Sequence, residues 1–478
     1  MRRWIPTLTV LIMTASVLSA AQHPNVLFIA VDDLRPQINC YGKDFMHTPH
    51  LDRLAERGVL FERAYCMVPT CGASRASLMT GIRPSSKRFI NYLTWAEKDA
   101  PGITTLNTHF KKNGYTTISL GKVFHHGTDN VQGWSETPWH PKTSDYHDQA
   151  RQSRAMAKHS KKYPNSKKPR GMPYEAFDDP DTSYRDAENA SKAITHMQRF
   201  AKQKDTPFFL AVGFYKPHLP FCAPQKYWDL YDASTIDVPP NYRAPAGAPK
   251  VALHTSGELR AYASIPPKGP VDLKTARKLI HGYYACVSFI DAQVGRLLDT
   301  VDRLGMADNT IIILWGDHGW QLGEHGMWNK HSCFETSMHA PLLVAAPCES
   351  GVKPGTRVRA LTEFIDIYPS LCDLAGLPQP AHLQGQSFVP LLKNPNAPWK
   401  PYAIGRYRLG DTIRSNQYRF SEYSKDGQHV TARMLYNHAT DPDETINASE
   451  QPDNDNTVTT LTRALRTRKG KPALNRQN

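Results

Sequence analysis

Residues 26–33 read VLFIAVDD, a short apolar run rich in β-branched side chains that stops at two carboxylates. Three more runs follow a similar pattern: residues 207–212 and 311–315 are apolar, residues 115–120 are rich in β-branched side chains, and each run leads into charged or imidazole groups. Helical stretches separate these runs, and such alternation is typical of a mostly parallel sheet with helices on both faces. We therefore expect an α/β fold with one large, mixed but mostly parallel sheet.

The polar residues that follow these runs are expected to meet. The carboxyl ends of parallel strands share one edge of a sheet, and open α/β sheets bind their ligands there. Taken singly, an Asp-Asp pair or an Asp-His pair is more simply explained by a turn or a helix cap. Together, Asp32, Asp33, Asp317 and His318 offer mainly oxygen ligands, which suit a divalent cation such as Ca²⁺ or Mg²⁺. The imidazole also leaves room for Zn²⁺ or Mn²⁺.

A second informative stretch is CGASRASLMTG, residues 71–81. A lone Cys is usually a buried structural residue. At background residue frequencies, however, this combination of Cys, Ala, Ser, Arg and Leu-Met-Thr-Gly arises by chance on the order of once per million chains. The stretch resembles the signature of the type I sulfatases, which belong to the alkaline phosphatase superfamily. The resemblance implies that a maturation enzyme oxidises Cys71 to formylglycine, whose hydrate is the nucleophile.

Three further segments resemble pieces of the same family, most strongly its iduronate-2-sulfatase branch: residues 121–127, 216–221 and 317–326. The resemblance implies one Ca²⁺ beside the formylglycine. Its implied metal ligands are Asp32, Asp33, Cys71, Asp317 and His318. The implied catalytic residues are Cys71, Arg75, Lys122, His125, His218 and Lys330.

The chemistry of a sulfate ester is compatible with these roles. The sulfuryl group must be held, its negative oxygens neutralised, and the nucleophile aligned with the leaving oxygen. The resemblance implies that Lys122 and Lys330 neutralise the sulfate, that His125 helps deprotonate the hydrate, and that His218 protonates the leaving oxygen. Lysine suits anion binding, and histidine suits acid–base work near neutral pH. Arg75 lies one helical turn after Cys71 and is therefore expected close to the nucleophile.

The chain is expected to contain four parts. Residues 1–21 combine a basic start, a short apolar core and small final residues, which together predict a secretory signal peptide. The resemblance to the sulfatases predicts a catalytic domain over residues 22–400. Alternating short strands with an Asp-Gly turn predict a C-terminal α+β subdomain with an antiparallel sheet over residues 401–452. Residues 453–478 are polar, and we expect a loose tail there.

Composition constrains the partners. The 478-residue chain has a formal net charge of +14, which favours anionic partners, but it shows no nucleic-acid-binding motif. A sulfated polysaccharide is the better match for a basic, exported protein, whether periplasmic, extracellular or, in a eukaryote, lysosomal. No segment is long and apolar enough for a membrane span. Residues 142–173 are polar and basic, and we interpret them as a solvated loop, with a substrate-facing lip for a polyanion as the alternative.

The sequence therefore favours a secreted sulfatase that acts on a sulfated carbohydrate. Two alternatives remain open at this stage. One is a phosphoester or phosphonate hydrolase of the same superfamily, since phosphate and sulfate esters are similar in shape. The other is a non-catalytic polysaccharide-binding protein in which Cys71 stays a thiol.

Overall fold

The computed structural model describes residues 23–203, 205–347, 350–427 and 429–469. A seven-stranded sheet in the order β12-β2-β11-β8-β1-β6-β4 forms its centre. Neighbouring strands run parallel except at β11, which is antiparallel to both β2 and β8. The strands are β1 (Asn25–Val31), β2 (Val59–Phe61), β4 (Thr116–Gly121), β6 (Phe208–Phe214), β8 (Thr310–Gly316), β11 (Leu342–Ala345) and β12 (Thr356–Val358). The predicted mixed, mostly parallel sheet is confirmed.

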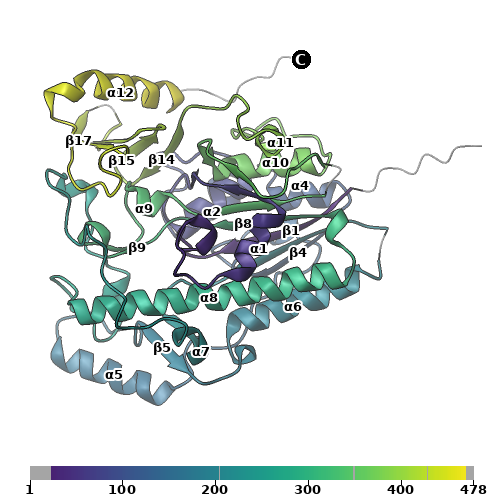
Figure 1. Ribbon diagram of the computed structural model, residues 1–478, viewed down its shortest axis with the longest axis horizontal. Helices are drawn as coiled ribbons and strands as arrows, with labels where there is room; N and C mark the ends of the chain where they lie inside the picture. The colour runs from purple at the N-terminus through teal and green to yellow at the C-terminus, as the bar shows by residue number, and fades with distance from the viewer. Residues whose placement is uncertain (1–22, 204, 348–349, 428, 470–478) are drawn as a thin grey trace, which may run out of the picture.

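Helices cover both faces of this sheet (Figure 1). Alternate residues of β1 enter two separate cores, because successive side chains of a strand point to opposite faces. Leu27 and Ile29 pack in one core with residues of α1 (Pro49–Arg57), α6 (Arg185–Phe200) and α8 (Leu273–Arg303). On the other face the core includes residues of α2 (Cys71–Thr80), α4 (Leu106–Lys112), α10 (Ile367–Leu374) and α11 (Val389–Lys393). The expected sandwich of helices around the sheet is thus present.

Shorter elements complete the larger part of the molecule. The remaining helices there are α3 (Ala96–Asp99), α5 (Gln149–Lys162), α7 (Gln225–Trp228) and α9 (Glu335–Met338). Three two-stranded sheets pair β3 (Ala64–Tyr65) with β13 (Thr362–Glu363), β5 (Tyr174–Phe177) with β7 (Phe221–Pro224), and β9 (Gln321–Leu322) with β10 (Trp328–Asn329). Within the described residues, no helix is long and apolar enough to cross a membrane. The predicted signal peptide, residues 1–21, lies outside the described residues.

A separate antiparallel sheet follows near the C-terminus. Its four strands are β14 (Ala403–Tyr407), β15 (Gly410–Arg414), β16 (Tyr418–Ser424) and β17 (Val430–Asn437), and each pairs with the next along the chain. The small antiparallel C-terminal sheet is therefore confirmed.

The expectation of a loose tail after residue 452 is wrong for residues 455–469. These residues form α12 (Asp455–Lys469), which lies over the C-terminal sheet (Figure 1). Leu461 and Leu465 are buried there against Ile413 and Phe420 of the sheet. The two leucines are spaced four residues apart, so they share one helix face, and a single apolar stripe holds an otherwise polar helix.

Replacing Leu465 with alanine tests how much this packing contributes. Leu465 has no exposed surface, so the substitution leaves a cavity between α12 and the sheet. We expect the free energy of unfolding to fall by about 2–5 kcal/mol. Urea unfolding measures it, and Thr459→Ala, at an exposed position of the same helix, is the control. An unchanged midpoint for Leu465→Ala would show that α12 is not packed in solution.

The interpretation of residues 142–173 as a loop also needs correction. The helix α5 occupies residues 149–162 within this stretch. Its buried positions include Gln152 and His159, seven residues and thus about two turns apart, so the helix has a packed face that is polar in sequence. Hydrophobic periodicity could not reveal such a face.

Candidate active site

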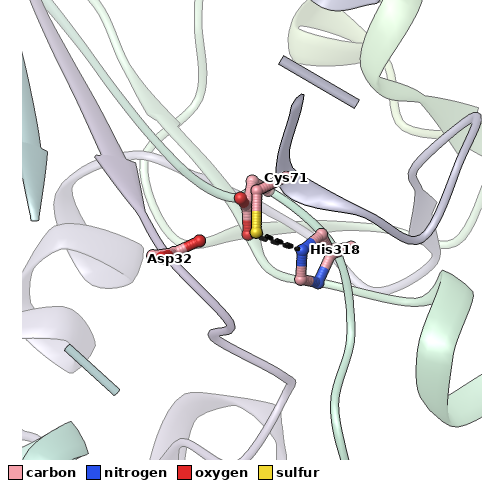
Figure 2. A group of neighbouring side chains, drawn as sticks. Asp32, Cys71 and His318 are labelled. Atoms are coloured by element: carbon pink, nitrogen blue, oxygen red, sulfur yellow. Dashed lines mark hydrogen bonds and ion pairs between the residues drawn. The ribbon is translucent and has the colours of Figure 1, made fainter. Parts of the chain in front are cut away.

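Four of the predicted site residues converge at the carboxyl edge of the sheet. Asp32 follows β1, Asp317 and His318 follow β8, and Cys71 is the first residue of α2. One ligand atom from each of these four lies within 4.8 Å of the others, and all four residues are buried. Figure 2 shows Asp32 and His318 on either side of Cys71.

The backbone explains why these residues meet. Hydrogen bonds between neighbouring strands continue past the strand ends: the Asp32 amide donates to Phe214 O at 3.2 Å and the Asp317 amide to Val31 O at 3.1 Å. The Lys122 amide donates to Gly213 O at 2.8 Å. The first polar residue after each strand is therefore held in register with its neighbours.

His318 places one ring nitrogen among the candidate cation ligands. Its Nδ1 lies 2.9 Å from Gly319 O, and because a carbonyl only accepts, Nδ1 carries the proton. Its Nε2 faces Cys71 Sγ at 3.2 Å and carboxylate oxygens of Asp33 and Asp317 at 3.4 and 3.5 Å. Metal-ligating histidines are commonly oriented in this way, by a hydrogen bond from the other ring nitrogen to a backbone carbonyl.

Arg75 is buried among the same carboxylates. Its Nε donates to Asp317 Oδ2 at 2.9 Å, and a terminal nitrogen lies 3.5 Å from Asp32 Oδ1. Although burial disfavours the guanidinium charge, these two carboxylates raise the pKa of Arg75. The residue therefore positions the acidic groups as a fixed cation, as its place in the motif suggested.

The donor set fits a divalent cation. Asp32 Oδ1 is buried and accepts no hydrogen bond among the described residues, although the Arg75 guanidinium lies 3.5 Å away, while Oδ2 pairs with Lys122. A buried carboxylate oxygen without a hydrogen bond is costly. A hard cation would satisfy it, with Asp32, Asp317 and His318 as ligands and Asp33 adjacent.

Asp33 belongs to a second, adjoining group of charges. Its carboxylate accepts from Lys330 Nζ at 3.0 and 3.1 Å, and Lys330 also contacts Glu258 at 3.0 Å. Glu258 in turn lies 2.9 Å from Nε2 of His218. The Lys330 ammonium occupies the space between the two carboxylates, so this group is already neutralised by the chain.

The two predicted acid–base histidines have opposite environments. Both ring nitrogens of His218 face acceptors, Leu219 O at 2.6 Å and Glu258 at 2.9 Å. Burial opposes the charged form, but the carboxylates, Asp33 foremost, raise the pKa of His218. Burial and then the Lys122 charge lower the pKa of His125 to about 3. The surroundings therefore favour the protonated form of His218 and the neutral form of His125, which is the division that an acid and a base require.

Sequence reasoning missed Glu258. It lies in the irregular, Pro-rich stretch between residues 238 and 270, where no periodicity or motif distinguishes one carboxylate from another. Its contacts with His218 and Lys330 become visible only when that stretch folds over the strand ends. Sequence reasoning also missed Asp145, which lies outside that stretch and is 3.1 Å from Lys216 Nζ.

A cavity of about 310 Å³ opens beside these groups. The residues that line it include Asp32, Lys122 and His218 from the predicted site. Arg170 and Arg185 lie in its wall, so cations outnumber the acids there. Such a cavity admits a small anionic group to the edge of the buried cluster.

Comparisons with known proteins agree with this geometry. Residues 24–377 match the family model described as Sulfatase, and residues 323–471 match one described as N-sulphoglucosamine sulphohydrolase, C-terminal. An iduronate 2-sulfatase from Homo sapiens is 35% identical over 408 residues, which cover 76% of this chain and 71% of the relative.

Two solved structures share the fold. One is a protein in complex with its substrate D-glucosamine-2-N,6-O-disulfate, with a TM-score of 0.74 and 22% identity, covering 95% of this chain and 100% of that chain. The other is a phosphonate monoester hydrolase of Agrobacterium radiobacter, with a TM-score of 0.75 and 24% identity, covering 93% of this chain and 95% of that chain.

The fold and the site define a hydrolase of the alkaline phosphatase superfamily. Within it, the chain belongs to the sulfatase family and is a sulfuric ester hydrolase.

Proposed function

We propose that this protein releases sulfate from a sulfated carbohydrate through a formylglycine made from Cys71, with one divalent cation such as Ca²⁺. The observation that carries the proposal is the convergence of Cys71, Asp32, Asp317 and His318 within 4.8 Å at the sheet edge. The 35% identity with an iduronate 2-sulfatase supports a sulfated sugar, with 2-sulfated iduronate as the first candidate.

Two groups would supply chemistry that the unmodified side chains lack. A formylglycine at position 71 would provide a hydrated aldehyde, one hydroxyl of which would be the nucleophile toward sulfur. A cation held by Asp32, Asp317 and His318, with Asp33 adjacent, would polarise sulfate oxygens and favour ionisation of that hydroxyl.

The other side chains act on the substrate around this centre. Lys122 and Lys330 neutralise the negative charge of the sulfate oxygens and hold the sulfuryl group in place. The neutral His125 accepts a proton from residue 71. His218, whose pKa Asp33 and Glu258 raise, donates a proton to the leaving oxygen.

The acid role of His218 predicts a dependence on the leaving group. A sugar alkoxide must be protonated as it leaves, whereas a nitrophenolate leaves without help. We expect His218→Ala to lower kcat for a sulfated sugar by about 10²–10⁴-fold and kcat for nitrophenyl sulfate far less. Steady-state kinetics on both substrates measure the ratio. Equal losses on the two would exclude proton donation by His218.

The proposed substrate class is tested by sulfate release from defined disaccharides. Disaccharides with sulfate at single known positions, 2-sulfated iduronate first, should be hydrolysed in preference to phosphate monoesters and phosphonate monoesters of similar size. A preference for phosphonate esters would instead support the hydrolase activity of the structural neighbour from Agrobacterium radiobacter.

The proposal also includes export and maturation. Residues 1–21 have the composition of a signal peptide, which supports a periplasmic or extracellular location, or a lysosomal one in a eukaryote. Since Cys71 is only 2% exposed in the folded protein, a formylglycine-generating enzyme would need to act on it before folding is complete.

A further inference from the structure

One segment of the chain carries positive charge without any negative charge. Residues 149–174 contain no Asp or Glu. They contain eight basic residues, which we call the basic tract: Arg151, Arg154, Lys158, Lys161, Lys162, Lys167, Lys168 and Arg170. All eight are exposed.

The helix α5 arranges the first part of this tract into a stripe. Arg151, Arg154, Lys158 and Lys161 follow one another at intervals of three, four and three residues, so they lie on one helix face. This face is distinct from the packed one, and it extends over about 15 Å. In Figure 1 the helix lies at the periphery of the molecule, away from α10 and α11.

The charges of the stripe are not balanced by the protein. None of the eight basic residues forms an ion pair with an acidic side chain within the described parts of the chain. Exposed arginines elsewhere do: Arg277 lies 3.1 Å from Asp237, and Arg357 lies 2.7 Å from Glu62. Like charges at these helical spacings destabilise a helix, so the stripe is a cost that folding alone does not explain.

The tract continues to the active-site cavity. Lys167 and Lys168 lie on the segment that leads from α5 to Arg170. The Arg170 amide donates to Ala261 O at 2.8 Å, which fixes this segment, and Arg170 lines the same cavity as Asp32 and His218. Through Arg170, the basic tract therefore reaches the wall of the cavity.

We propose that the basic tract binds the chain of a polyanionic polysaccharide while one of its sulfated residues lies in the active-site cavity. This inference rests on the proposed function and specifies its substrate as a polymer. Charge complementarity and continuity with the cavity identify the occupant as the substrate chain itself. Binding is electrostatic and exposed, so it weakens as salt shortens the Debye length from about 10 Å at 0.1 M.

The test uses the full chain with Arg154, Lys158 and Lys161 replaced by glutamine, which is a good helix former. A matched control replaces Lys112, Lys353 and Lys393, exposed lysines outside the tract, and removes the same charge. We expect the tract variant to have a KM for a heparin-type polymer on the order of tenfold higher at low salt. Its kcat, and its kinetics on nitrophenyl sulfate, should not change. Raising the salt should erase the difference from the wild type.

Binding to immobilised heparin separates this inference from the proposed function. The tract variant should elute at lower salt than the control variant, and this readout does not require turnover. Equal elution of both variants, or an unchanged polymer KM, would overturn the inference while leaving sulfatase activity intact. Tighter retention on single-stranded DNA than on heparin would assign the tract to nucleic acid and overturn it as well. Absence of activity on every sulfate ester would instead refute the proposed function.

Discussion

Replacing Cys71 with alanine should reduce sulfate release by on the order of 10⁴-fold or more, because the covalent nucleophile is lost. The fold should persist, since the substitution removes only one buried sulfur and costs about 1 kcal/mol. Sulfate release from a defined disaccharide and urea unfolding of the same preparation measure the two effects.

The matched control is Cys66→Ala. Cys66 is also buried and its thiol contacts Ser337 O at 3.8 Å, but it is not a member of the metal-ligand group. It should retain activity within a few-fold. Substantial turnover by Cys71→Ala, or equal losses for the two variants, would contradict the role assigned to residue 71.

The second large effect is expected at the cation site. Chelation should abolish activity, and return of a divalent cation should restore it. His318→Gln should lower the cation content of the purified protein and reduce activity by about 100-fold or more. Mutating a residue that only hydrogen-bonds to a metal ligand already lowers metal affinity or activity by about 10–100-fold. Glutamine keeps a polar side chain of similar length at this position, so the fold should tolerate the substitution.

His281→Gln provides the control for that experiment. His281 is buried on α8, where its Nε2 lies 2.8 Å from Trp228 O, and it is not part of the ligand group. Cation content should be unchanged in this variant. Full cation content and activity in His318→Gln would show that the imidazole is not a ligand. Elemental analysis also identifies the ion, because a site with one imidazole accepts several divalent metals.

The sequence allowed the core of the fold and site to be predicted because both depend on strand ends. Apolar runs define β1 and β8, and the residues that immediately follow them, Asp32, Asp317 and His318, inherit their positions from the sheet register. Cys71 and Arg75 were found through a motif whose spacing matches a helix turn. Local sequence was therefore sufficient to predict a residue's place in the site where a strand or a helix fixes that place.

Other features depend on long-range packing that local sequence does not encode. Glu258 reaches His218 only because an irregular segment folds across the site, and no pattern marks it. The face of α5 that packs inward is formed by Gln152 and His159, which read as exposed residues. In α12, Leu461 and Leu465 are buried because they pack against a sheet whose last strand ends some 20 residues before the helix begins.

The most direct test of the account is the mass of the peptide that carries residue 71, taken from protein of measured activity produced in its native source. We predict an aldehyde or its hydrate at this position, in a fraction that rises with the specific activity of the preparation. A fully active protein in which residue 71 is an intact thiol would contradict the account.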